Sequence, residues 1–256
     1  MISSGQSVRS SAVAARSVGN SARETVRWRG GWARLGPWRG RPEIAHVVVG
    51  TAAPPTAQAV RDCLERARAA GYGSVLTNAL SPRDSAPFVD AGFDIRERLH
   101  LLERGPDPLP SDAVDPRLPP LQRARRGDRA AVLTIDERAF QPFWQLEASG
   151  LDDALAATPT ARFRVATSMG TGVVAYAITG RAGRNGYLQR IAVDPAARRL
   201  GFGRALVLDG LGWLGRHGVT RTLVNTQLDN DAALALYESC GFRRLPVGLC
   251  VLGRSL

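Results

Sequence analysis

The sequence contains no lysine, since all 34 of its basic residues are arginine. Cysteine and histidine are also scarce, with three of each. The cysteines, Cys63, Cys240 and Cys250, are odd in number and lack CxxC or zinc-type spacing, so we expect buried, reduced thiols and no metal site. No apolar run approaches the ~20 residues that cross a bilayer. These absences predict a soluble, cytoplasmic protein without a membrane partner.

Positive charge is concentrated near the N-terminus. The formal net charge is +11, and residues 1–45 contain eight arginines against two glutamates. Residues 1–22 are rich in Ser, Ala, Gly and Arg and have no apolar period, so we predict that residues 1–40 form a disordered basic tail. An acid-free start is also typical of an organellar transit peptide.

Within this tail, tryptophans alternate with arginines between Val26 and Trp38. Basic and aromatic side chains interleaved in this way can stack on single-stranded nucleic acid. The same pattern also fits a short hairpin about Gly30-Gly31 whose tryptophans face a core. We favour the hairpin, and nucleic acid is therefore not the expected partner.

From residue 41 the hydrophobic pattern becomes regular and divides the chain into two units. Six prolines between Arg104 and Pro120 mark residues 105–120 as a semi-rigid linker between domains at 41–104 and 121–256. In the first unit the pattern predicts strands at 44–49, 74–77 and 94–102 and helices at 56–70 and 82–91. In the second it predicts helices at 128–140, 143–157, 203–217 and 230–239 and strands at 162–167, 172–179, 187–193, 221–226 and 242–252.

The two units repeat the same order of elements. At an offset of 149 residues Gly92-Phe93 matches Gly241-Phe242, and upstream the offset falls to 144. The first unit therefore lacks five residues where the second has an Arg/Gly loop, and its counterpart, residues 50–55, ends in two prolines that cannot donate N–H groups. We predict an α/β fold (α+β, mixed sheet) with a complete C-terminal copy and a partial N-terminal copy that has lost its anion site.

The loop after residues 187–193 has the features of an anion site. The predicted strand breaks at Asp194-Pro195 and the chain re-enters a helix through Arg198-x-x-Gly201-x-Gly203. N–H groups at a helix N-terminus lack intrahelical partners, and the helix dipole places about half a positive charge there. Glycine lets the backbone approach a pyrophosphate closely, and arginine adds charge-assisted hydrogen bonds.

Two motifs make the second unit resemble the GNAT (Gcn5-related N-acetyltransferase) superfamily. Arg198-x-x-Gly201-x-Gly203 matches its R/Q-x-x-G-x-G/A acyl-CoA loop, and Asn230-x-x-Ala233-x-x-Leu236-Tyr237-Glu238-x-x-Gly241-Phe242 matches its next helix. Residues 44–103 resemble a degenerate half of the same fold, so the whole chain is similar to tandem GNAT proteins. The resemblance implies the GNAT fold and an N-acetyltransferase with acetyl-CoA as the acyl donor, bound at one site per chain.

The resemblance also implies residue roles. Tyr237 would act as the general acid that protonates the leaving thiolate. Backbone N–H groups of Ile191 and Val193 would polarise the thioester carbonyl. Asn230 would cap its helix and meet the pantetheine arm. The residues implied to bind acetyl-CoA are Ile191, Ala192, Val193, Arg198, Arg199, Leu200, Gly201, Phe202, Gly203, Arg204, Asn230, Ala233 and Tyr237.

The general base is not evident from the sequence. The inward-facing candidates on the two central strands are Tyr187, Gln189 and Asn225, which are poor bases at pH 7. A carboxylate from the first helices such as Glu147, a water relay, or an acceptor that is already partly neutral all stay open. An α-amine has a pKa near 7.7–8 and a lysine ε-amine one near 10.4, which favours a peptide N-terminus or a small-molecule amine as acceptor.

The acceptor pocket is predicted to form from residues 140–151, residues 180–184 and the terminal strands, with Phe143 and Trp144 as candidate lining residues. Two other functions stay open: a non-catalytic acyl-CoA-binding regulatory module and a basic nucleic-acid-binding protein. The sequence also leaves a homodimer open.

Overall fold

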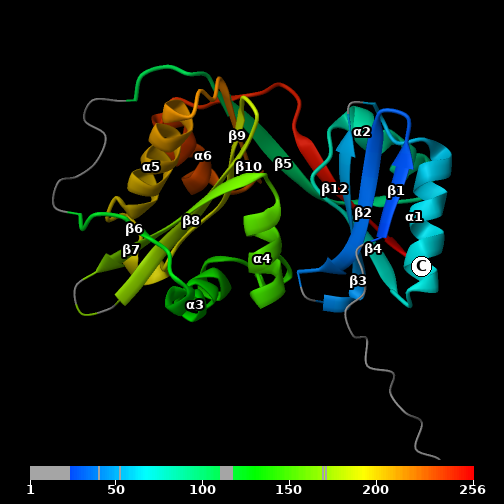
Figure 1. The fold of residues 1–256 in the computed structure, drawn as a ribbon, viewed down its shortest axis with the longest axis horizontal. Coiled ribbons are helices and arrows are strands. Elements are labelled where there is room, and N and C mark those ends of the chain that lie inside the picture. Colours follow the sequence, from blue (N-terminus) through cyan, green and yellow to red (C-terminus); the bar gives the residue numbers. More distant parts are fainter. Residues whose placement is uncertain (1–23, 40, 52, 110–117, 169, 171) are drawn as a thin grey trace, which may run out of the picture.

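The computed structural model describes residues 24–256 except residues 40, 52, 110–117, 169 and 171 (Figure 1). In these residues the strands form one 12-stranded sheet in the order β1-β2-β3-β4-β12-β5-β10-β9-β8-β7-β6, with β11 paired to β5. The pairs β3–β4 and β9–β10 are parallel and the other pairs are antiparallel. The mixed sheet with helices on its faces confirms the predicted α+β class.

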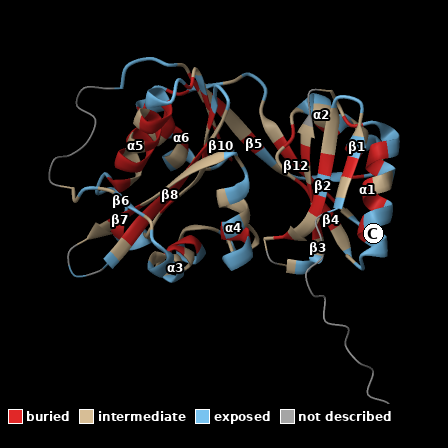
Figure 2. Cartoon of the chain, in the orientation of Figure 1, coloured by how far each residue is buried: buried red, intermediate tan, exposed pale blue. Residues whose placement is uncertain are grey.

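The N-terminal half, residues 24–104, contains β1 (Glu24–Trp28), β2 (Gly31–Trp38), β3 (Arg41–Thr51), α1 (Ala57–Ala69), β4 (Ser74–Thr77), α2 (Pro82–Asp90) and β5 (Asp94–Arg104). The Thr56 hydroxyl accepts a 3.1 Å hydrogen bond from the Ala59 N–H at the start of α1. Val60, Leu64 and Ala67, spaced by one helical turn, bury the inner face of α1 against the sheet. In Figure 2 this face is red, the colour of buried residues.

The predicted disordered tail at residues 1–40 is wrong for residues 24–39. These residues form β1, the Gly30 turn and β2, which pairs with β3, because Val26, Ala33 and Leu35 alternate toward the core under α1. Residues 1–23 lie outside the described residues. The expected hairpin about Gly30-Gly31 is confirmed, with Trp28 packed against that core.

The C-terminal half, residues 122–256, contains β6 (Gln122–Arg123), α3 (Arg129–Ala139), α4 (Ala148–Ala156), β7 (Thr160–Ser168), β8 (Gly172–Ala182), β9 (Asn185–Val193), α5 (Phe202–Arg216), β10 (Arg221–Gln227), α6 (Asp231–Ser239), β11 (Arg243–Arg244) and β12 (Leu249–Ser255). Helices α5 and α6 pack on one face of its strands, and α3 and α4 pack on the other (Figure 1). Among the described residues, no helix has the length and apolar character that a membrane span needs.

One predicted helix is shorter than expected. The helix predicted at 143–157 begins only at Ala148, and residues 142–144 form a single 3₁₀ turn. Phe143 and Trp144 turn away from a helical path because both rings pack against Trp38 of the N-terminal half.

Strands β5 and β12 cross between the two halves. They form an antiparallel pair with each other, in which Leu99 of β5 faces Leu249 of β12. On its other edge β5 pairs with β10 of the C-terminal half, whereas β12 pairs with β4 of the N-terminal half. The prediction of residues 121–256 as a domain of their own is therefore corrected, since the linker divides the sequence but not the sheet.

We expect residues 121–256 expressed alone not to unfold cooperatively, because the fragment lacks β5 and leaves the edge of β10 uncovered. Circular dichroism during thermal unfolding measures this. Residues 24–104 supplied as a second chain should restore a cooperative transition, since they carry β5. A fragment that melts like the full chain would show that the pairing of β5 with β10 is not needed for cooperative unfolding.

Candidate active site

The centre of the C-terminal half is a place where two parallel strands part. Strands β9 and β10 pair only where residues 185–187 face residues 221–223. Beyond Tyr187 and Leu223, β9 continues beside β8, and β10 continues beside β5. The facing edges of β9 and β10 therefore carry backbone N–H and C=O groups without a partner strand, so the strand edges at this gap are polar.

A β-bulge determines which face of the sheet each side chain of β9 occupies at this gap. Leu188 faces Thr179 and Arg190 faces Ile178, so Gln189 is an extra residue in β9. As a result Leu188 and Ile191 both pack against the α5 and α6 side of the sheet, although they are three residues apart. Ala192 instead packs against α3. Of the residues predicted to bind acetyl-CoA, Ile191 and Val193 thus lie on the side of the sheet covered by α5. Ala192 can contribute only its backbone on that side.

The predicted anion loop connects β9 to α5 and is shaped by left-handed residues. The Asp194 carboxylate accepts from the Ala196 N–H at 2.9 Å and stabilises a 3₁₀ turn at residues 195–197. Arg199 has φ 65° and Gly201, the N-cap of α5, has φ 92°. Gly201 has no side chain to cap the helix, so the first N–H groups of α5 are available to an anion. Leu200 is exposed in this loop.

The side chains of two residues of this loop are already engaged within the protein. Phe202 is buried in the core with Leu206, so only its backbone can reach a ligand. The Arg204 guanidinium donates to the Ser239 carbonyl at 3.1 Å and hydroxyl at 3.0 Å. Arg204 therefore ties α5 to the end of α6, because its long side chain reaches the carbonyls left open there. A Cβ on Gly203 would lie 3.3 Å from Leu236, so glycine allows the two helices to approach closely.

Helix α6 positions the predicted acid. The Asn230 side chain accepts from the Ala233 N–H at 3.1 Å and caps the helix, as predicted. Tyr237 is 8% exposed, and its ring packs edge-on against Phe242 at 5.8 Å. Among the described residues its hydroxyl has no hydrogen-bond partner. Burial raises the Tyr237 pKa to about 12, so the phenol stays protonated at neutral pH and can donate a hydrogen bond.

Three of the predicted base candidates, Tyr187, Gln189 and Asn225, carry neither a carboxylate nor an imidazole. The Gln189 side chain donates to Thr158 at 3.3 Å, and its carbonyl oxygen is buried without a partner in the described chain. Asn225 is exposed on β10, and Glu147 is exposed at the start of α4. In the described part of the chain, no three His, Cys, Asp or Glu side chains gather as metal ligands would.

A buried ion pair beside the bulge was not predicted. Asp136 is fully buried on α3, and both its oxygens accept from Arg190 at 2.8 Å in a two-pronged pair. The same carboxylate accepts from the Leu146 N–H at 2.6 Å and from the Tyr176 hydroxyl. One signal in the sequence is that Asp136 follows Val132 by one turn and so lies on the apolar face of α3.

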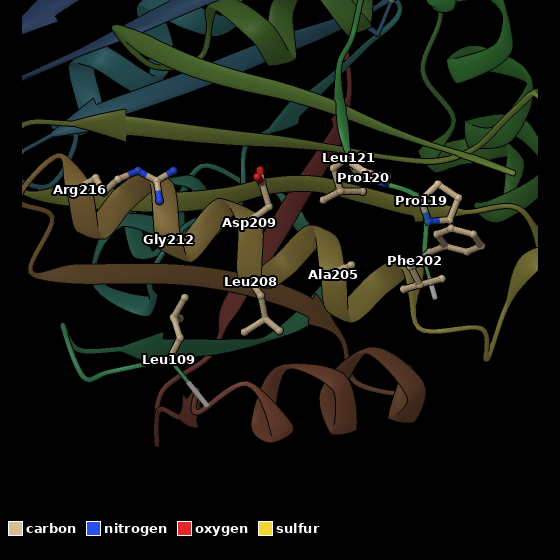
Figure 3. Close-up of a pocket in the computed structure, with 11 residues that line it drawn as sticks. Leu109, Pro119, Pro120, Leu121, Phe202, Ala205, Leu208, Asp209, Gly212 and Arg216 are labelled. Atoms are coloured by element: carbon tan, nitrogen blue, oxygen red, sulfur yellow. The ribbon is translucent and has the colours of Figure 1, made fainter. Parts of the chain in front are cut away.

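A cavity of about 380 Å³ lies away from this gap (Figure 3). It separates α5 from residues 118–121, and Figure 3 shows Leu208, Asp209 and Gly212 of α5 along it. The Asp209 carboxylate is already held by Arg162 at 2.7 and 2.8 Å. Its described lining includes no residue of β9, β10 or α6, so the cavity is separate from the place where the strands part.

Comparison with known proteins identifies similar sequences and folds. The model of the acetyltransferase (GNAT) family matches residues 129–242. The chain is 30% identical over 212 residues to a mycothiol acetyltransferase of Amycolatopsis mediterranei, covering 68% of each chain. It is 34% identical over 178 residues to one of Thermobispora bispora, covering 64% of this chain and 60% of that one. A tandem GNAT protein from the clavulanic acid biosynthesis pathway superposes with a TM-score of 0.61 at 16% identity, covering 88% and 79% of the two chains.

We expect Asp136→Ala to lower the free energy of unfolding by about 3–5 kcal/mol, because it leaves the Arg190 charge buried without its partner. Urea unfolding measures the change. Asp152→Ala is the matched control: Asp152 pairs with Arg129 at the surface, and its loss should cost less than about 1 kcal/mol. Equal losses in the two variants would contradict a special role for the buried pair.

Proposed function

Because the chain belongs to the GNAT family of acetyltransferases, we propose that it uses acetyl-CoA to acetylate a primary amine on a small molecule or a peptide N-terminus. The parting of β9 and β10 beside the uncapped N-terminus of α5 is the observation that supports this proposal most directly. An extended thioester arm can hydrogen-bond to the unpaired strand edges at this gap, and a pyrophosphate can bind to the N–H groups at a helix N-terminus.

The loop of residues 198–204 would hold the pyrophosphate. Arg199 and Gly201 have left-handed backbones, a conformation found in loops whose N–H groups bind anions, and Gly203 keeps the helix start free of side chain. Arg198 and Arg199 would add charge-assisted hydrogen bonds. Asn230 and Ala233, at the start of α6, would meet the pantetheine arm, and N–H groups of Ile191 and Val193 would bind the thioester oxygen.

Tyr237 would act as the general acid that protonates the leaving sulfur. Attack by the amine on the thioester carbonyl forms the amide C–N bond, breaks the C–S bond and releases a thiolate, while the amine loses a proton to solvent. The protonated phenol donates a hydrogen bond, and then its proton, to that thiolate, and the phenolate regains a proton from solvent. The raised pKa makes Tyr237 a weaker acid than an exposed tyrosine but keeps it in the form that donates.

The acceptor amine should be one that needs little help to lose its proton. The side chains of Tyr187, Gln189 and Asn225 at the gap include no carboxylate or imidazole. At pH 7.5 roughly a third of an α-amine is neutral, against about one part in a thousand of a lysine ε-amine. A small-molecule amine also agrees with the mycothiol acetyltransferases among the relatives.

We expect Tyr237→Phe to lower kcat by about 10²–10⁴-fold while the KM for acetyl-CoA changes little, because the phenol acts only as the sulfur leaves. A CoA-release assay measures both constants. Tyr72→Phe, in the core of the N-terminal half, is the control and should leave them unchanged. In the wild-type enzyme, deprotonation of Tyr237 should cause no loss of rate between pH 7 and 10. Full kcat in Tyr237→Phe would refute the assignment.

The acceptor class has its own test. At pH 7.5 alaninamide should be acetylated with a kcat/KM roughly 100-fold above that of Nα-acetyl-lysinamide, and the ratio should shrink as the pH rises toward 10, because the lysine amine becomes neutral. Lysine acetylation as fast as α-amine acetylation at pH 7.5 would contradict the preference and would imply a general base elsewhere.

A further inference from the structure

The turn between β2 and β3 in the N-terminal half meets the C-terminal half beside the predicted acceptor pocket. The Trp38 ring stacks on Phe143 at 5.7 Å and meets Trp144 edge-on at 5.8 Å. On α4, a Cβ at Gly150 would lie 3.2 Å from the Arg39 Cα. The partial copy of the fold is therefore packed against the segment that connects α3 to α4.

Arginines from both halves hold this connecting segment by its carbonyl groups. The Trp144 carbonyl accepts from Arg190 at 2.7 Å and also from Arg39. The Pro142 carbonyl accepts from Arg41 at 2.6 Å. The sharing of one carbonyl oxygen places the Arg39 guanidinium next to Arg190, the residue that follows the bulge in β9.

The positive charges at this place exceed the negative ones. Arg190 is matched by Asp136, whose oxygens also accept from Leu146 and Tyr176. Among the described residues, neither Arg39 nor Arg41 forms an ion pair with a carboxylate. Burial, followed by repulsion from Arg190, lowers the Arg39 pKa to about 9, and the attraction of Asp136 offsets only part of this shift.

Arg39 retains hydrogen-bonding capacity for a ligand. A guanidinium has five N–H donors, and within the described part of the chain Arg39 makes a single hydrogen bond, through Nη1 to the Trp144 carbonyl. Its carbon lies 4.7 Å from the Trp38 ring centre and 5.2 Å from that of Trp144, so the two indoles fix the plane of the fork. A planar fork between apolar rings suits bidentate binding of a carboxylate or phosphate.

We propose that Arg39 binds an oxyanion, a carboxylate or a phosphate, that the amine acceptor carries in addition to its amine. This inference rests on the proposed function. It makes the partial copy a contributor to acceptor specificity. The C-terminal half binds acetyl-CoA, and the N-terminal half selects acceptors that carry a negative charge. Arg41 and Arg190 are positioning residues here, because their bonds fix the carbonyls on which Arg39 rests.

The test compares matched acceptors by CoA release in the full chain. The phosphate pair is glucosamine 6-phosphate and glucosamine, and the carboxylate pair is glycylglycine and glycylglycinamide. We expect the wild-type kcat/KM to be at least about tenfold higher for the anionic member of one pair, as a charge-assisted hydrogen bond would give. The pair that shows the preference identifies the oxyanion.

Variants assign the preference to Arg39. Arg39→Gln should remove the preference, mainly by raising the KM of the anionic member more than that of the neutral member, and the thermal transition followed by circular dichroism reports intact folding. Arg39→Lys should keep part of it, because the charge remains without the fork. Arg61→Gln, on the exposed side of α1, is the control and should change neither member.

The outcomes separate the two proposals. Absence of CoA release with every acceptor refutes the proposed function, and the inference with it. Turnover with equal kcat/KM for both members of both pairs refutes the inference alone, whatever the variants do. An equal loss for both members in Arg39→Gln also refutes it, because Arg39 would then only support the connecting segment.

Discussion

The exchange of β5 and β12 is the constraint on which the rest of the structure depends. Each of these strands pairs on one edge with the other and on its opposite edge with the half of the chain from which it does not come. Backbone hydrogen bonds across one continuous sheet therefore join the halves, and neither half can complete its sheet alone. This arrangement also places the β2–β3 turn beside the segment between α3 and α4.

The two copies differ at the N-termini of their corresponding helices. In α1 the Thr56 hydroxyl takes up one of the free N–H groups, and the chain before it contains two prolines. In α5 the corresponding position is Gly201, which has a left-handed backbone and no capping side chain. A capped helix start has little left to offer an anion, whereas an uncapped one keeps its donors and its dipole. The difference agrees with a donor site in the C-terminal copy alone.

The two sides of the proposed active site are built differently. The proposed donor side would use backbone groups of β9, α5 and α6, whose positions follow from bulge, turn and cap geometry. The proposed acceptor side would use long side chains from both halves, anchored by the buried pair of Asp136 and Arg190. Such a pair contributes little net stability when intact, but it fixes the orientation of the groups around it. In that role it holds the connecting segment against β9.

The sequence by itself determined the local features of this protein. The Gly201 loop, the Asn230 cap, the repeat and most helices follow from residue spacing, because glycine, capping residues and apolar periodicity act over a few residues. The tertiary structure alone decided which strands exchange, that Asp136 faces Arg190, that Arg204 binds α6, and that residues 24–39 join the sheet. Strand partners and buried charges depend on what covers them, and that is set by residues distant in the sequence. Asp136 and Arg190 are 54 positions apart, and Leu102 of β5 faces Val224 of β10.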